Sequence, residues 1–195
     1  AVSSSHGALA FQENTIRQNS AAEAGGLLID EALSVALTGN AILSNSASGN
    51  AGGLWVLETA DATLDGNLIM HNRASAACGG LEIVLIGNAL LVNNVIADNQ
   101  AGVAGAAACV VGSSPRLLHT TLARNSGGDG SGLVVVDAGS VHSTVALTNT
   151  LMVDHAIAIS VTDGNTLSLA AVLWDGSTPI TVSQGAGAAV SVQGQ

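Results

Sequence analysis

One stretch decides the fold: Asn67-Leu68-Ile69-Met70-His71-Asn72-Arg73-Ala74-Ser75-Ala76-Ala77-Cys78-Gly79-Gly80-Leu81. It holds three signatures in a fixed order, which are a lone Asn67, an Ile-x-x-Asn unit at 69–72 and a Gly-Gly-Leu unit at 79–81. Self-similarity at a fixed period of about 20 to 50 residues indicates a repeat architecture. Copies of these signatures elsewhere in the chain would therefore indicate such an architecture.

All three signatures recur at intervals close to 27 residues, the interval from Gly52 to Gly79. The Ile-x-x-Asn unit returns as Ile16-Arg17-Gln18-Asn19, Ile42-Leu43-Ser44-Asn45, Ile96-Ala97-Asp98-Asn99, Leu122-Ala123-Arg124-Asn125 and, weakly, Met152-Val153-Asp154-His155. The Gly-Gly-Leu unit returns as Gly25-Gly26-Leu27, Gly52-Gly53-Leu54, Ala106-Ala107-Ala108 and Gly130-Ser131-Gly132-Leu133. The lone polar residue returns as Asn14, Asn40, Asn94, Thr120 and Thr150.

The residues between the signatures predict strands. They form short alternating runs broken by Gly, Asn and Ser, and no helical period is sustained through any unit. Three short strands in about 27 residues leave no room for crossover helices, so each unit buries its apolar side chains only by coiling and stacking on the next. The sequence therefore predicts an all-β solenoid.

The Gly-Gly-Leu and Ile-x-x-Asn units resemble the right-handed parallel β-helix. They are especially similar to the Gly-Gly-[Ala/Leu]-Ile and Phe-x-x-Asn repeats of polymorphic outer-membrane or autotransporter-type passenger proteins, with Ile or Leu in place of Phe. The resemblance covers residues 9–150. It implies a single domain, 1–195, of about seven coils of about 22 to 30 residues, regular over 9–150 and looser over 151–195. A repeat of this kind specifies architecture and leaves activity open.

The repeated polar and glycine positions have structural interpretations. Stacked Asn side chains at strand ends are expected to adopt turn conformations with φ > 0 and to hydrogen-bond as ladders. The Gly pairs predict tight turns or close backbone approach. The predicted turn ladder consists of Asn14, Asn19, Asn40, Asn45, Asn67, Asn72, Asn94, Asn99 and Asn125.

The outward positions are also largely apolar, if the Ile column points inward. Two explanations stay open: a second layer, from the tail after residue 156 or from parts of a longer chain, or lateral packing against copies or a partner. The uncapped ends of the solenoid have two explanations of their own, removal from a longer solenoid or end-to-end stacking into a fibre. The predicted interface residues are Leu43, Leu68, Met70, Trp55, Leu57, Val134 and Val136.

Composition limits the partners. The chain has 14 acidic and 4 basic residues, for a net charge of −10, and the basic residues are all Arg. Nucleic acid and anionic membrane surfaces are therefore unlikely partners. The sequence also has no apolar run long enough to span a membrane as a helix.

No catalytic constellation emerges, and we expect no catalytic, cofactor-binding or metal-binding residues. Asp98, Asp154 and Asp175 are separated by one or more coils, and Ser5-His6-Gly7 matches only a fragment of the polygalacturonase pattern. The segment 127–133 resembles one damaged calcium-binding nonapeptide, which cannot bind alone. The histidines lack paired ligand spacing, which predicts turn or surface roles.

The two cysteines, Cys78 and Cys109, occupy different positions in consecutive coils. Counting strand rise places them about 13 Å apart, beyond disulfide reach, so we expect free thiols.

These observations favour an extracellular or cell-surface solenoid with a structural or adhesive role, which associates with itself or a partner through apolar outer faces. The alternative is a polysaccharide lyase- or hydrolase-like or carbohydrate-binding β-helix whose active loops lie outside this chain. Surface glycan is thus a second candidate partner.

Overall fold

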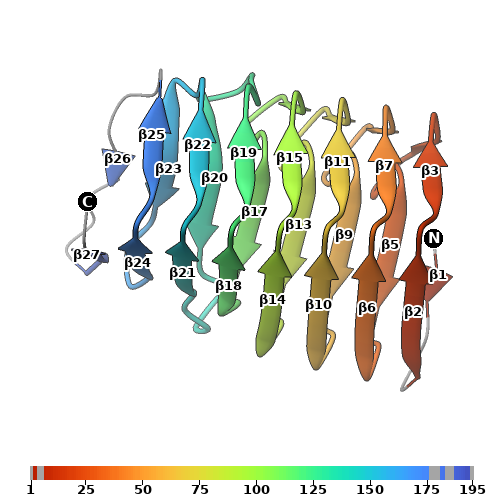
Figure 1. Cartoon of the computed structure of the whole chain (residues 1–195), viewed down its shortest axis with the longest axis horizontal. Helices are drawn as coiled ribbons and strands as arrows, with labels where there is room; N and C mark the ends of the chain where they lie inside the picture. The colour runs from red at the N-terminus through yellow and green to blue at the C-terminus, as the bar shows by residue number, and fades with distance from the viewer. Residues whose placement is uncertain (1, 4–6, 176–180, 183–186, 194–195) are drawn as a thin grey trace.

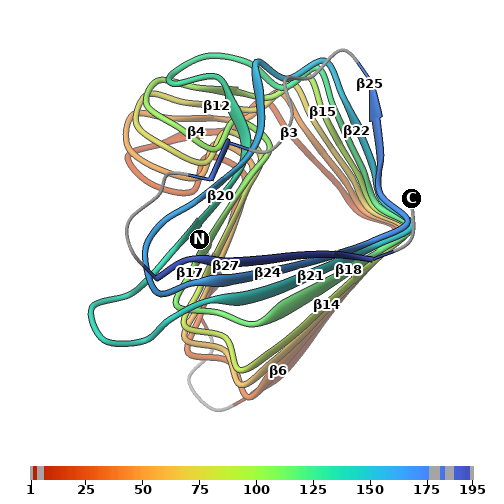
Figure 2. The ribbon, with the colours of Figure 1, turned by 90° about the vertical axis from the view of Figure 1, so that its left-hand side faces the viewer.

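The computed structural model describes residues 2–3, 7–175, 181–182 and 187–193. Over these residues it contains strands, turns and bends and no helix. The chain winds as a parallel β-solenoid (Figure 1), and in end view three sheets enclose a triangular core (Figure 2). The prediction of an all-β solenoid of about seven coils is confirmed.

Four parallel sheets make up the solenoid. Sheet A contains β1 (Val2–Ser3), β5 (Leu27–Asp30), β9 (Leu54–Leu57), β13 (Leu81–Val84), β17 (Ala108–Val111), β20 (Ser131–Val136), β23 (Ile157–Val161) and β26 (Thr181–Val182). Sheet B contains β2 (Ala8–Gln12), β6 (Ser34–Thr38), β10 (Asp61–Asp65), β14 (Asn88–Val92), β18 (Pro115–Leu118), β21 (Thr144–Thr148), β24 (Thr166–Ala170) and β27 (Ala189–Gln193). Sheet C contains β3 (Thr15–Arg17), β7 (Ala41–Leu43), β11 (Leu68–Met70), β15 (Val95–Ala97), β19 (Thr121–Ala123), β22 (Leu151–Val153) and β25 (Leu173–Asp175). Sheet D contains β4 (Ser20–Ala21), β8 (Ser46–Ala47), β12 (Arg73–Ala74) and β16 (Gln100–Ala101).

The register places equivalent residues of successive coils side by side. Ile69 pairs with Ile42 on one side and Ile96 on the other, and all three are fully buried. The neighbours of Ile69 on its strand, Leu68 and Met70, then point outward because side chains alternate across a strand. The predicted inward column and outward flanks are confirmed.

Sheet D corrects the expected three strands per coil. In the first four coils a two-residue strand follows sheet C, and the chain then curves back before entering sheet A. We call the segments 20–26, 46–53, 73–80 and 100–107 the arcs. In Figure 2 they bulge outward at the corner between sheets C and A.

The Gly pairs end the arcs, where successive backbones come very close. A Cβ on Gly53 would lie 2.5 Å from the carbonyl oxygen of Gly80, and a Cβ on Gly80 would lie 2.6 Å from that of Ala107. The predicted close approach is confirmed. The left-handed conformation belongs instead to the preceding residue, with φ of 53° at Ala51 and 65° at Cys78.

The Asn ladders are also confirmed. Asn72 Oδ1 accepts from the backbone N–H and the side-chain amide of Asn45, at 2.9 and 3.0 Å, while Asn72 Nδ2 donates to the carbonyl of Ile42. The expectation of φ > 0 at the ladder Asn residues is wrong, because the preceding residue adopts it, for example His71 at 56°. The Asn side chains are needed inside the corner, where they satisfy buried backbone groups.

The described strands after residue 156 do not fold back over an outer face. Its described strands continue the stack, with β23 on β20, β24 on β21 and β25 on β22. One proposed source of a second layer is therefore excluded for these strands.

Candidate interaction surface

The outer face of sheet C is apolar along most of the solenoid. Its strands are three residues long, so each presents its first and third side chains outward. Leu68 is 36% exposed and Leu173 66% exposed. Predicted interface residues Leu43 and Met70 are half-buried on the same face. The other outward apolar residues of sheet C are Ala41, Val95, Ala97, Ala123, Leu151 and Val153.

The outer face of sheet A is apolar too, but the arcs cover part of it. The remaining predicted interface residues, Trp55, Leu57, Val134 and Val136, are half-buried on this sheet. Residues between Trp55 and Val134 in the same outward row, Glu82 and Cys109, are only 5% and 3% exposed. Sequence periodicity placed the two apolar faces in one class, whereas the structure separates them.

A disulfide fastens one arc to this face. Cys78 in the arc of the third coil bonds Cys109 on β17 of the fourth coil, with Cα atoms 5.3 Å apart. The expectation of free thiols is therefore wrong. Strand rise separates positions within an extended chain, but the arc curves back over the outer face and brings the two positions together. A Cβ on Gly105, the Cys78 equivalent in the next coil, would lie 2.5 Å from Cys109 Sγ.

Glu82 is a buried acid on the part of sheet A that the arcs cover. Its register neighbours are Trp55 on β9 and Cys109 on β17. Burial, together with the charge of Glu23 on the first arc, raises the pKa of Glu82 from 4.5 to about 7. Glu82 Oε2 and Trp55 Nε1 have no hydrogen-bond partner among the described residues. Glu82 is not among the predicted site residues, although a carboxylate inside an apolar row was the available signal.

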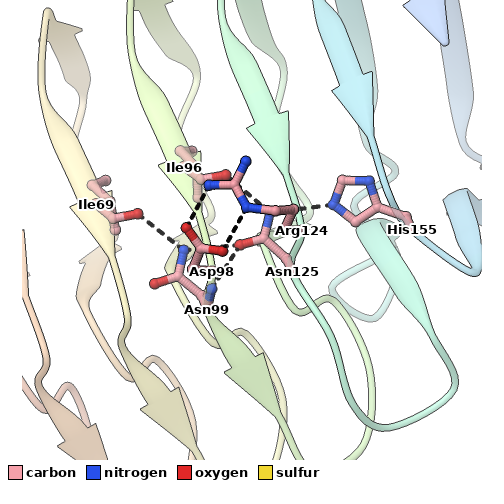
Figure 3. A network of polar contacts seen from close by, with 7 residues as sticks. All are labelled: Ile69, Ile96, Asp98, Asn99, Arg124, Asn125 and His155. Atoms are coloured by element: carbon pink, nitrogen blue, oxygen red, sulfur yellow. Dashed lines mark hydrogen bonds and ion pairs between the residues drawn. The ribbon is translucent and has the colours of Figure 1, made fainter. Parts of the chain in front are cut away.

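The corner beyond sheet C is polar. The Arg124 guanidinium donates to both carboxylate oxygens of Asp98, at 2.8 and 2.6 Å, and holds the pKa of that carboxyl below its usual range. Behind this exposed pair, Asn99 and Asn125 continue the buried ladder toward His155 (Figure 3). Burial lowers the pKa of His155. That residue takes the place of an Asn in the ladder and is buried, so a surface role does not apply to it.

The remaining carboxylates do not gather into a metal site. Across the described ranges, no group of three or more His, Cys, Asp or Glu side chains could hold a metal ion. Asp129, in the nonapeptide-like segment, accepts hydrogen bonds from the N–H and hydroxyl of Ser131. Asp175 pairs in register with Val153, the residue before Asp154, so the two carboxylates belong to different coils. Ser5-His6 lies outside the described residues.

Hollows with polar side chains lie at other places on the solenoid. One of about 490 Å³, at the corner between sheets A and B, is lined by Glu31, Glu58, Leu33 and Leu85 among others. Another of about 200 Å³ crosses three coils on the outer face of sheet B. Its lining includes Asp61, Thr63, Asn88 and Arg116, and the Asn88 amide donates to Asp61 at 3.1 Å.

A family model described as "Right handed beta helix region" matches residues 1–187. Neither a curated protein nor a solved structure matches the chain at a significant level. Within the described part of the chain, the structure holds no helix long and apolar enough to cross a membrane.

Proposed function

The chain belongs to the right-handed β-helix family, and from this premise we propose that it is a structural or adhesive solenoid that associates through the apolar outer face of sheet C. The observation that supports this proposal is that the arcs cover part of one apolar outer face and none of the other. The arcs lie over the outer face of sheet A, whereas Leu68 and Leu173 on sheet C are exposed. Burying apolar surface stabilises contact by about 25 cal/mol per Å².

Low charge favours the same behaviour. Only 9% of the residues are charged, and sheet C carries charged outward side chains only in its end strands, β3 and β25. Little electrostatic repulsion therefore opposes contact between two such faces.

An oxidising compartment fits the disulfide. Cys78 and Cys109 are bonded, and disulfides persist mainly in secreted, periplasmic or cell-surface proteins. We therefore propose an extracellular or cell-surface location.

Replacing Leu68 and Met70 with Asp tests the interface. Both side chains point outward, so the fold should stay intact while self-association is lost, because two carboxylates would be buried without partners. Sedimentation velocity over a range of concentrations measures the change. The matched control is Leu90→Asp with Val92→Asp on the outer face of sheet B, which should keep association. Association retained by the Leu68 and Met70 variant would defeat the proposal.

A glycan-binding role is the second candidate, and the hollow on sheet B favours it. Carboxylate, amide, guanidinium and hydroxyl groups line that hollow across three coils, and such groups can hydrogen-bond sugar hydroxyls. A strictly monomeric protein that is retained on an acidic polysaccharide column, and is released by Arg116→Ala, would favour this role over the first.

A further inference from the structure

The outer face of sheet C carries opposite charges at its two ends. The third position of the first strand is Arg17, and the third position of the last strand is Asp175. Both are exposed. The register joins them through a single row of apolar residues: Leu43, Met70, Ala97, Ala123 and Val153.

We propose that the partner of this face is a second copy of the chain, packed face to face about a two-fold axis parallel to β15, so that the two solenoids run in opposite directions. This inference rests on the proposed function and adds the identity and orientation of the partner. The axis keeps strand direction and reverses the order of coils. The first coil of one copy then faces the seventh coil of the other.

Side-chain sizes fit this arrangement. The central strand β15 meets itself, so Ala97 faces Ala97 and Val95 faces Val95. On either side a large residue meets a smaller one, as interdigitating layers require. The facing pairs are Met70 with Ala123, Leu68 with Thr121, Leu151 with Ala41, and Leu43 with Val153. Ala123 is 5% exposed, so it forms a low part of the face onto which the partner's Met70 fits, whereas the Ala97 pair on the axis is small against small.

The other two-fold arrangement, with the solenoids running the same way, fits poorly. It would reverse strand direction and match each strand with its own equivalent. Leu68 would then face Met70, large against large, while Thr121 would face Ala123 and leave a gap. Asp175 would face the apolar Leu173.

The end charges select the same orientation. In the antiparallel pair each Arg17 faces the partner's Asp175, which gives two opposite-charge contacts at the rim. Charges of this kind contribute more to orientation and specificity than to affinity.

The face is small, and this sets the expected strength. Seven strands at about 4.8 Å spacing make it about 29 Å long. It therefore belongs with small, transient interfaces, whose association depends on concentration.

Single-cysteine variants test the orientation directly. Arg17→Cys and Asp175→Cys are prepared separately, one with an affinity tag, then mixed and oxidised under conditions that keep Cys78 and Cys109 bonded. We expect mixed disulfide dimers to exceed each homodimer by at least about fivefold, because only residues that face each other cross-link efficiently. Cross-linking of Arg17→Cys mainly to itself would place first coils together and overturn the inference.

Charge reversal gives an independent measurement. Arg17→Asp alone and Asp175→Arg alone should each weaken dimerisation about tenfold, because each turns two attractive contacts into repulsive ones. The double variant should restore wild-type association. Arg73→Asp, which makes the same charge change on sheet D, is the control and should have little effect. Additive weakening in the double variant would contradict the inference.

The two levels of the proposal fail differently. Wild-type protein that stays monomeric at all accessible concentrations removes the proposed function and the inference together. Association that is lost in the Leu68 and Met70 variant but is indifferent to charge reversal overturns only the antiparallel pair.

Discussion

Sheet A and sheet C carry similar apolar outer rows, but the arcs cover the middle of the row on sheet A, where Glu82 and Cys109 are buried, and no arc covers the row on sheet C. On sheet A the chain provides its own cover, because the arcs curve back over the outer face and Cys78 is bonded to Cys109. On sheet C the chain passes to the next corner without returning, and Leu68 and Leu173 are exposed. An apolar outward row therefore predicts that something covers it. The row alone does not indicate whether the cover is part of the same chain or a separate partner.

Gly80→Ala should have the largest effect on this comparison, because it acts where the arc joins sheet A. The new Cβ would lie 2.6 Å from the carbonyl oxygen of Ala107 and 2.9 Å from Asn99 Nδ2. We expect a loss of more than about 3 kcal/mol in the free energy of unfolding, measured by urea denaturation. Gly66→Asn is the control, since a Cβ there meets nothing within 4 Å and Asn tolerates φ > 0. Equal stability of the two variants would mean that arc and sheet are not tightly apposed.

Loss of the disulfide should come next. The Cys78→Ala and Cys109→Ala double variant opens a link between residues 31 positions apart, which should cost about 3 kcal/mol. A reductant should lower the urea midpoint of the wild type and leave the double variant unchanged. If reductant has no effect on the wild type, the cover of sheet A does not depend on the bond.

Glu82 should make stability depend on pH. Its folded-state pKa is raised to about 7 by burial and by Glu23, so the folded state holds the proton that the unfolded state has released. Stability is therefore lost as the pH rises from about 4.5 to 7, by roughly 3 kcal/mol. Glu82→Gln should flatten this slope in urea midpoints taken between pH 5 and pH 8. The control is Glu58→Gln, at an exposed acid, which should keep the wild-type slope. An unchanged slope in Glu82→Gln would show that water reaches the Glu82 carboxylate.

The smallest effect on stability is expected on sheet C. Leu68→Asp with Met70→Asp should lower the free energy of unfolding of the monomer by about 1 to 2 kcal/mol, because both side chains lose the part of their apolar surface that the solenoid itself buries. Unfolding is measured at a concentration where the wild type is monomeric. A large destabilisation would indicate that the chain itself buries this face, and would remove the contrast with sheet A.

The coil, the inward Ile column and the Asn ladders could all be predicted from the repeat period. These features are set by contacts between equivalent positions of neighbouring coils, so a fixed period reveals them. Ile42, Ile69 and Ile96 stack because each stands about 27 residues from the next. Ladder bonds such as Asn45 to Asn72 follow from the same spacing.

The repeat period does not predict which outer face is covered, that Cys78 reaches Cys109 or that Glu82 is buried. It also does not predict that Arg17 and Asp175 share one row. These features follow from the folded chain. The arc brings together two different positions of consecutive coils, which no repeat period relates. Its path depends on a left-handed residue before each Gly pair, such as Cys78 itself. The direction that the backbone takes at these turns is not fixed by the spacing of the repeats, so counting strands does not predict it.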